Sequence, residues 1–361
     1  MNLSEWVIVI PSIREINLDY LKYVPNEVSI IVVDDSNGSI KPNRDNMQVF
    51  DYDFQARVMG SNYDLIPHKT AACRNFGFYY VYKFTDFKYI ITLDDDCKTR
   101  PQFMEQYSIL GQTLVLDTVI CPGWYNTIEM FDLATVLYAR GYPYWERYPK
   151  SYQITQTEGR VVCHMGLWDN ILDTDGIDKY LFEEYQKTYE NLALKRPLLR
   201  IGTSEHPVKF PLCAMNLGFI REVLPIMYQM PMSELFTDRY SLWRFDDIWA
   251  GYIIQTLISL KGDAITVGQP IVQHLKSGNL RKEILGEHYG HFISHYLYAI
   301  IDDASIEIPV SNYPEMYVAL FDYILTNAER IKRRYKIPDL YYKYIIDTSL
   351  KLLRWGKLFL S

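Results

Sequence analysis

Three adjacent carboxylates, Asp94, Asp95 and Asp96, follow the apolar run Tyr89-Ile-Ile-Thr-Leu93. Such a run is typical of a buried parallel strand, and ligands of open α/β sheets gather at the carboxyl ends of these strands. Three like charges repel one another unless a cation neutralises them, and Mg²⁺ or Mn²⁺ prefers carboxylate oxygens. We therefore predict a divalent-metal site held by Asp94 and Asp96. A loop of solvated acids or a helix N-cap region is the alternative.

Two earlier apolar runs also end in polar residues. Trp6–Pro11 reads as a first buried strand and is followed by Ser12 to Arg14, whereas Ser29–Val33 ends in Asp34 and Asp35. In nucleotide-binding α/β folds an acid at the second strand end can accept hydrogen bonds from a ribose or base. A local turn at the Ser-Asn-Gly sequence that follows would use the same carboxylates.

The stretch from His68 to Phe84 joins these strands to the acidic one. Small residues lead into an aromatic helical run, so a βαβ crossover would bring its start toward the same sheet edge. Arg74 lies there, and its planar fork suits the acids or a diphosphate.

Composition limits the class of protein. At 361 residues, 48% of them hydrophobic, the chain suggests one large domain with an appendage. A net charge of -7 argues against a general nucleic-acid binder. Five scattered cysteines, no signal-peptide pattern and no apolar run of the ~18 residues needed for a membrane span predict a soluble, cytoplasmic protein with reduced thiols.

Several blocks along the chain resemble, in the same order, the reversibly glycosylated polypeptide family, the UDP-arabinopyranose mutases. The resemblance covers roughly residues 6 to 285, and so many ordered blocks are more specific than one motif. The blocks are Val7–Arg14, Ile30–Asp34, Lys69–Gly77, Leu93–Cys97, Arg140–Pro143, Gly166–Trp168, Phe210–Leu217 and Arg244–Gly251.

The resemblance implies a GT-A-like α/β fold, a Rossmann-like mixed sheet flanked by helices, that binds UDP-sugar and a divalent metal. It implies a catalytic domain over residues 1–280 and a C-terminal helical region over 281–361. The acidic triplet would be its DxD-like motif on metal and diphosphate, with Asp34 near the uridine. The other residues expected to bind substrate in this first part of the chain are Pro11, Ser12, Arg14, Lys69, Arg74 and Asp95.

Two arginines seven residues apart, Arg140 and Arg147, match the family pattern, and the resemblance makes Arg140 the sugar-carrying position. A guanidinium has a pKa above 12 and no free lone pair, so it is a poor nucleophile. Both arginines could instead clamp the diphosphate, and the covalent and clamp roles stay open. Before them, residues 131–140 read as a helix ended by a Gly-Tyr-Pro turn.

Four later residues are assigned to the sugar pocket. Trp168 could be a sugar platform or an ordinary core side chain, and Asn216 is a polar group within an apolar stretch. Asp246 and Asp247 begin a long apolar helix, where they suit the helix dipole or could orient hydroxyls, assist ring opening or accept a proton from Arg140. Met165 stands where the family has a histidine before the glycine, so no histidine role is carried over here.

His274 follows a strand predicted from Ala264 to Val272 and is the expected third metal ligand, with Lys276 near phosphate. Imidazole suits Mn²⁺ better than Mg²⁺, so manganese is favoured and magnesium is second. Helices are predicted over residues 313–334 and 340–360, with Pro338 between them. The last helix is expected to pack on the catalytic domain, with a membrane surface or an oligomer contact as alternatives.

The sequence therefore predicts a UDP-arabinopyranose mutase whose partner is a UDP-sugar, UDP-arabinose first. A metal-dependent glycosyltransferase acting on a glycan or protein is the second hypothesis. A non-catalytic UDP-sugar carrier or assembly partner is the third, since Thr70 and Met165 depart from the family pattern. We expect no nucleic-acid partner and no membrane span, and homo-oligomerisation is open.

Overall fold

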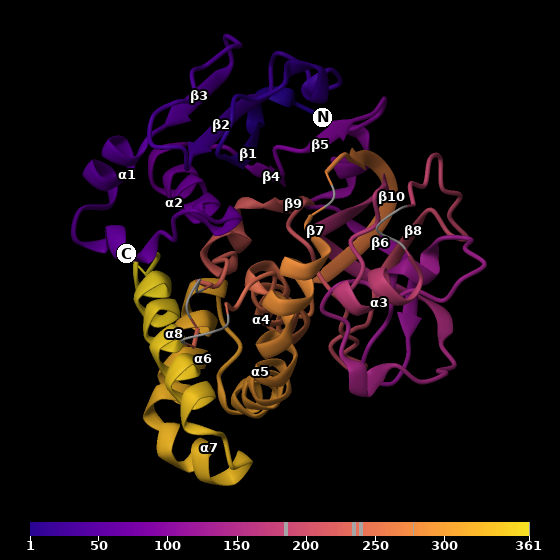
Figure 1. The fold of residues 1–361 in the computed structure, drawn as a ribbon, viewed down its shortest axis with the longest axis vertical. Helices are drawn as coiled ribbons and strands as arrows, with labels where there is room; N and C mark the ends of the chain where they lie inside the picture. Colours follow the sequence, from indigo (N-terminus) through magenta and orange to yellow (C-terminus); the bar gives the residue numbers. More distant parts are fainter. Residues whose placement is uncertain (184–186, 233–235, 238–240, 277, 361) are drawn as a thin grey trace.

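A ten-stranded mixed sheet organises the chain in a computed structural model that describes residues 1–183, 187–232, 236–237, 241–276 and 278–360. The strand order is β3-β2-β1-β4-β9-β7-β6-β8-β10-β5 (Figure 1). The strands are β1 (Trp6–Ser12), β2 (Ser29–Asp34), β3 (Met47–Phe50), β4 (Tyr89–Leu93), β5 (Cys97–Thr99), β6 (Thr113–Ile120), β7 (Gln153–Asn170), β8 (Leu198–Ile201), β9 (Asn216–Ile220) and β10 (Ala264–His274). The α-helices are α1 (Tyr52–Met59), α2 (Arg74–Phe84), α3 (Gly176–Leu181), α4 (Asp246–Lys261), α5 (Leu280–Glu307), α6 (Tyr313–Thr326), α7 (Ala328–Tyr335) and α8 (Asp339–Lys357).

The first four strands form the parallel, Rossmann-like part of the sheet. β1 pairs in parallel with β2 and β4, and β2 with β3. Every residue of β1 is buried, which explains its continuous apolar sequence. Because the strands are parallel, the ends of β1, β2 and β4 meet at one sheet edge, where Ser12, Asp34 and Asp94 lie. The predicted α/β class, a mixed sheet flanked by helices, is confirmed.

The far end of the sheet curls back toward that edge. Three residues separate Leu93 from Cys97, so β5 begins within about 15 Å of the end of β4 because consecutive Cα atoms are ~3.8 Å apart. Yet β5 is the last strand of the sheet, where it pairs antiparallel with β10 and places Cys97 opposite His274. His274 is therefore the last residue of a strand, not part of the following loop, and the sheet curvature carries it to the acidic turn.

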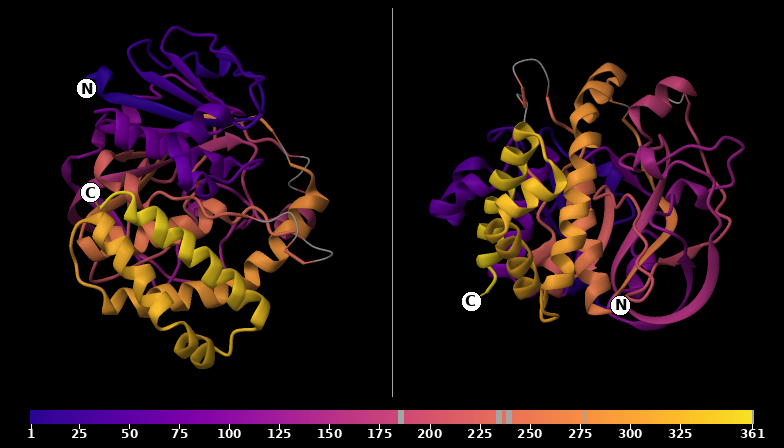
Figure 2. Two further views of the ribbon diagram at one scale, coloured as in Figure 1. Left: turned by 90° about the vertical axis from the view of Figure 1, so that its left-hand side faces the viewer. Right: turned by 90° about the horizontal axis from the view of Figure 1, so that it is seen from below.

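The C-terminal helices gather on one side of the sheet (Figures 1 and 2). They confirm the predicted helices and the break at Pro338. Trp355 of α8 is buried and donates its indole N–H to the carbonyl of Pro225 at 2.9 Å, while Arg354 pairs with Asp64 at 2.6 Å. The last helix thus packs on the sheet domain, as expected. Within the described ranges no helix is both long and apolar enough to cross a membrane.

The helix predicted over residues 131–140 was wrong. This segment is irregular, with single bridges from Phe131 to Leu194 and from Ala139 to Thr174. The Asn126 amide donates to the carbonyl of Leu137 and accepts from the N–H of Ala139. Hydrogen bonds to this side chain and the two backbone bridges therefore take the place of helical hydrogen bonds. These contacts are long-range, and the local apolar pattern could not reveal them.

Candidate functional site

The acidic turn at the end of β4 lies among cations that come from distant parts of the chain. Asp94 pairs with Arg74 and Asp95 pairs with Arg14. Asp95 also accepts a 2.6 Å hydrogen bond from the Ser12 hydroxyl at the end of β1. The meeting of the β1 and β4 ends therefore brings together the residues that were predicted to bind substrate there.

Arg74 is held rigidly under the turn. Its side chain is 2% exposed, and it donates to the carbonyls of Ala71 and Ala214, both at 2.9 Å, and to the Thr92 hydroxyl at 2.5 Å. A guanidinium with these bonds and one carboxylate partner is fixed in orientation. In this structure Arg74 holds Asp94 in place. Of the two partners that the sequence suggested for Arg74, the acids and a diphosphate, the structure shows the acids.

Asp96 and His274 face each other across the curled sheet. The Nε2 atom of His274 lies 4.0 Å from a carboxylate oxygen of Asp96, and Arg14 lies 3.9 Å from the other. Burial and the charge of Asp94 raise the pKa of Asp96 to about 6. Since desolvation and neighbouring acids disfavour the ionised form, extra positive charge at this point would stabilise it.

The three predicted metal ligands match a divalent ion by type, but the ligand atoms of Asp94, Asp96 and His274 do not all lie within 4.8 Å of one another in this structure. The Nδ1 atom of His274 lies 3.0 Å from the carbonyl of Ile171, which can only accept, so Nδ1 is the donor to this carbonyl and Nε2 is the ring nitrogen turned toward Asp96. One imidazole with the carboxylates of Asp94 and Asp96 suits Mn²⁺. The backbone N–H of Leu275 donates to the carbonyl of Asp96 at 3.0 Å, which places the exposed Lys276 beside the turn.

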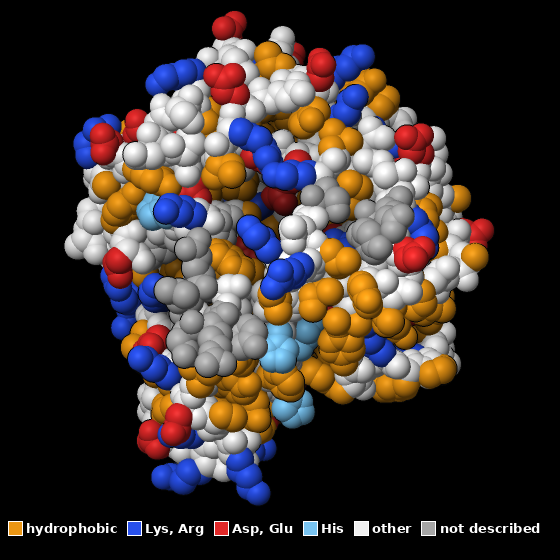
Figure 3. Space-filling model, viewed as in Figure 1, with side chains coloured by type: hydrophobic (Ala, Val, Ile, Leu, Met, Phe, Trp, Pro, Cys, Tyr) orange, Lys and Arg blue, Asp and Glu red, His pale blue; other side chains and the backbone are white. Residues whose placement is uncertain are grey.

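A hollow opens on this face of the molecule. Figure 3 shows carboxylates at its floor and Lys and Arg side chains around its rim. A negative floor with a positive rim suits a metal ion with a diphosphate above it, because each layer neutralises the next.

The two acids at the end of β2, Asp34 and Asp35, accept hydrogen bonds from different loops. Both oxygens of the fully buried Asp34 accept bonds from the turn that follows, from the backbone N–H groups of Ser36 at 2.7 Å and Gly38 at 3.0 Å. The local turn therefore uses Asp34, and the nearby Asp35 accepts from the backbone N–H of Thr70 at 2.9 Å. This bond holds the loop in which Lys69 is exposed with a positive φ of 59°.

Arg140 is buried in a cage of acceptors. Its Nε–H donates to Asp173 at 2.7 Å, and its two terminal nitrogens donate to the two oxygens of Asp247, both at 2.9 Å. The remaining N–H groups face the carbonyl of Arg244 and, at 3.7 Å, the sulfur of Cys213. All five guanidinium N–H groups are thus engaged, and the two carboxylates raise the pKa of Arg140 well above its usual value.

The Arg140 cage touches the acidic turn through one residue. The backbone N–H of Ala214 donates to Asp247 at 3.2 Å, and its carbonyl accepts from Arg74 at 2.9 Å. Burial and the charge of Asp247 raise the pKa of Asp246, at the start of α4, to about 6. The predicted catalytic pair of aspartates therefore splits into an ionised anchor, Asp247, and a carboxyl that titrates near neutral pH.

The glycine after Arg140 is required by the close approach of α4. Gly141 has a positive φ of 81°, and a Cβ built on it would lie 2.5 Å from a side-chain carbon of Ile248. Only glycine satisfies both demands, which explains the Arg-Gly step of the motif.

Arg147 forms a second arginine centre with different partners. It pairs with Asp178 at 2.8 Å and Asp175 at 3.5 Å, between the rings of Tyr138 and Tyr144. Arg140 and Arg147 share no carboxylate among the described residues, so they form two separate arginine centres. The two centres are linked by the backbone of residues 173–175.

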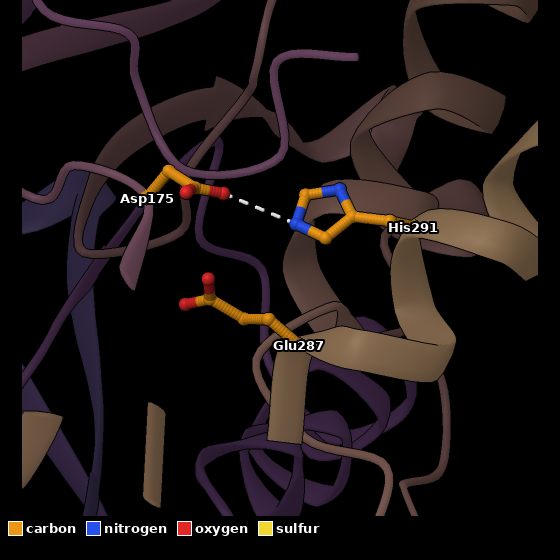
Figure 4. Close-up of side chains that lie close together, drawn as sticks. All are labelled: Asp175, Glu287 and His291. Carbon is orange, nitrogen blue, oxygen red and sulfur yellow. Dashed lines mark ion pairs between the residues drawn. The ribbon is translucent and has the colours of Figure 1, made fainter. Parts of the chain in front are cut away.

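Figure 4 shows Asp175, Glu287 and His291, the one set of three ligand-type side chains in the described part of the chain whose ligand atoms all lie within 4.8 Å of one another. His291 pairs with Asp175 at 3.1 Å, and Arg244 pairs with Glu287 at 2.6 Å. Arg147 and Arg244 already supply positive charge to these carboxylates. We therefore interpret the cluster as part of a buried ion-pair network and not as a cation site.

Two predicted sugar contacts are corrected by burial. Asn216 is fully buried, accepts from the hydroxyl of Tyr107 and donates to the carbonyl of Leu167 at 3.1 Å, so its amide is already satisfied. Trp168 is also buried, beside a void of about 10 Å³ that it shares with Arg140. That volume is about one water molecule, so the core alternative for Trp168 holds and no sugar-sized space exists beside it.

The sequence reasoning missed the acids that hold the two arginines. Asp173 and Asp175 have the same Asp-x-Asp spacing as the β4 turn. Glu283, Glu287 and His291 recur at four-residue intervals, which places them on one face of α5. These two spacings were the available signals.

Comparison with known proteins shows the family of the chain. The model of the reversibly glycosylated polypeptide family matches residues 1–338. UDP-arabinopyranose mutase 3 of Arabidopsis thaliana is 32% identical over 301 residues, covering 78% of this chain and 75% of the relative. Probable UDP-arabinopyranose mutase 4 of the same plant is 30% identical, covering 78% and 74%, and UDP-arabinopyranose mutase 2 is 26% identical, covering 98% and 92%.

A solved structure, TarS 1–349 of S. aureus in complex with UDP-GlcNAc, aligns with 98% of this chain and 90% of its own at 12% identity and a TM-score of 0.31. The family match spans nearly the whole sheet domain and the helices up to residue 338, including the acidic turn and both arginine centres. The chain therefore belongs to the reversibly glycosylated polypeptide family.

Proposed function

We propose that this chain is a UDP-arabinopyranose mutase, which interconverts UDP-arabinopyranose and UDP-arabinofuranose. The observation that carries the proposal is the contact through Ala214 between the acidic turn and the Arg140 cage. Through this contact the acids that would bind metal and diphosphate are linked to the carboxylates that would bind the sugar. Relatives named as UDP-arabinopyranose mutases support the choice of substrate.

The acidic turn would hold the nucleotide end. Asp94, Asp96 and His274 would bind a divalent ion, Mn²⁺ first, and this ion would supply positive charge for the diphosphate. Arg14, whose side chain is 40% exposed, and the exposed Lys276 would bind phosphate oxygens. Their charge stabilises UDP as it leaves the anomeric carbon, where negative charge develops on the diphosphate.

Asp246 would handle protons at the sugar. When the bond to UDP breaks, a water oxygen would bond to the anomeric carbon to give the free sugar, and this water would be lost again when UDP reattaches. Ring opening then protonates the departing ring oxygen and ring closure deprotonates the attacking hydroxyl, and a carboxyl with a pKa of about 6 can return and accept this proton at neutral pH. Asp247 cannot do this while Arg140 holds both of its oxygens and lowers its pKa. Asp246 is thus the acid–base residue, and Asp247 positions it.

Arg140 would act as a fixed counter-ion rather than as the sugar acceptor. Attack on a sugar requires a deprotonated nitrogen with a free lone pair, whereas Arg140 is buried, fully engaged and strongly protonated. Its charge keeps Asp247 ionised beside Asp246.

Ring exchange is the direct test of this function. Incubation of the protein with UDP-arabinofuranose and Mn²⁺ should produce UDP-arabinopyranose, followed by the anomeric proton signals in NMR spectra. A chelator should stop the exchange. Release of free arabinose, or labelling of an acceptor without ring exchange, would instead indicate a glycosyltransferase, and binding without either would indicate a carrier.

The pH dependence of exchange should identify Asp246. Because the basic form of Asp246 exists above its pKa, the rate should rise with pH through about 6. Asp246→Asn should lower kcat by roughly 10²–10⁴-fold and remove this limb. Asp96 also has a pKa raised to about 6, so a limb that persists in the asparagine variant would assign the ionisation to Asp96 and contradict the role of Asp246.

A further inference from the structure

A second cavity lies away from the acidic turn, between α4, α5 and the short 3₁₀ helix at Tyr144–Glu146. Its volume is about 610 Å³, within the roughly 300–1,000 Å³ typical of small-molecule sites. It is lined by the later turns of α4, and Thr256 lies nine residues from Asp247, about 13 Å along the helix. No residue of the acidic turn or of the Arg140 cage lines it.

A buried lysine faces this cavity. Lys209 is 9% exposed, its Nζ donates to the Thr256 hydroxyl at 2.5 Å and it lies 4.5 Å from the ring centre of Tyr252. Within the described ranges it forms no ion pair with a carboxylate, and burial lowers its pKa to about 8. An ammonium has three donors and the Thr256 hydroxyl uses one, so two remain for a ligand, and an anion would compensate the buried charge.

Aromatic rings form the wall of the cavity. Trp145 is 42% exposed at the rim, with the His295 ring edge-on to it at 5.2 Å. Tyr252 and Tyr298 are stacked at 4.0 Å beneath. An exposed indole face suits the C–H face of a sugar ring, and the hydroxyls of Ser204, Ser259 and Ser305, which also line the cavity, suit sugar hydroxyls.

The charges of the lining select the kind of anion. Lys209 is the one Lys or Arg among the lining residues, whereas Glu146 and Asp302 contribute carboxylates. Glu146 is already paired with Lys150, so a phosphate dianion would bring two negative charges against the one charge of Lys209 and would meet Asp302 as a further like charge, which disfavours it more than a monoanion. A single carboxylate on a hydroxyl-rich ring matches one lysine and still allows Glu146 and Asp302 to accept hydrogen bonds from hydroxyls.

We propose that this cavity is a second carbohydrate site that binds a uronic acid residue, with the carboxylate on Lys209 and the ring against Trp145. The site lies outside the mutase chemistry and does not depend on it. A chain that exchanges a UDP-sugar at one face would thereby bind an acidic saccharide at another.

The test measures binding of glucuronate, glucose and benzoate to the full chain by calorimetry and saturation-transfer NMR. Glucuronate should bind saturably. Glucose should bind with an affinity at least about tenfold lower, because glucose lacks the carboxylate. Lys209→Met, which keeps the length of the buried side chain, should weaken glucuronate binding at least about tenfold, and Trp145→Ala, an exposed position, at least about fivefold. Lys343→Met, on the exposed face of α8, is the matched control and should bind like the wild type.

Three outcomes would overturn the site. The first is a failure of glucuronate to saturate the wild type. The second is unchanged glucuronate binding by both Trp145→Ala and a folded Lys209→Met. The third is competition by benzoate as strong as that of glucuronate, which would indicate an aromatic anion site. UDP binding serves as the folding check for each variant. It should be unchanged by both substitutions, so failure here is distinguishable from failure of the proposed mutase function.

Discussion

The double variant Asp94→Asn/Asp96→Asn should lose metal-dependent binding of UDP by on the order of 100-fold or more, about 2.7 kcal/mol. Both replacements keep an oxygen that can accept from Arg74 and Arg14 but remove two negative charges that a divalent ion requires. Calorimetric titration of UDP with Mn²⁺ and then with a chelator measures the effect. In the wild type the chelator should weaken UDP binding strongly, and in the variant it should change little.

Asparagine is chosen because alanine at position 94 would leave the buried Arg74 without any acceptor there, whereas the amide oxygen of asparagine keeps one. Loss of one partner of a buried pair costs about 3–5 kcal/mol, and the fold could fail for that reason alone. Asp117→Asn is the control, since Asp117 pairs with Arg196 on the surface. The Arg196 side chain is 48% exposed and the Asp117 side chain is 35% exposed. Unchanged Mn²⁺-dependent UDP binding in the folded double variant would refute the metal site.

Arg140→Ala should destabilise the protein by about 3–5 kcal/mol, because Asp173 and Asp247 would stay buried without their shared cation. Urea unfolding followed by circular dichroism measures the loss. Arg196→Ala is the matched control, a half-exposed arginine with one carboxylate partner, and should cost about 1 kcal/mol or less. An Arg140→Ala variant as stable as this control would show that the cage does not stabilise the fold.

Arg140→Lys separates stability from chemistry. Lysine keeps the positive charge but cannot bind both oxygens of Asp247 and Asp173 together, so the carboxylates at the start of α4 would shift. We expect a folded variant that binds UDP and Mn²⁺ and exchanges sugar rings on the order of a hundredfold more slowly, about 2.7 kcal/mol of barrier. Intact-mass spectra after incubation with UDP-sugar measure whether a sugar becomes attached to the protein. A sugar adduct on the wild type that this variant lacks would assign attachment to Arg140 and contradict the counter-ion role.

The hydrophobic pattern of the sequence marked the strands that lead to the acidic site and the points where they end. The runs before Ser12, Asp34 and Asp94 could be read directly, because a buried strand needs consecutive apolar residues and its end is marked by the first polar ones. Parallel pairing then placed these ends at one edge. The acidic turn and its neighbourhood were therefore predictable without coordinates.

Only the tertiary structure decided which charges meet. Arg74 pairs with Asp94, and Asp34 accepts hydrogen bonds from the loop that follows it. Arg140 is enclosed by Asp173 and Asp247, which lie 33 and 107 residues away along the chain. Such pairings depend on how the sheet curls and on which rotamers the packing allows, and neither leaves a local signature. Sequence determines the segments because their patterns are local, whereas the folded chain selects the ion pairs because a charge pairs with whichever opposite charge long-range closure brings within reach.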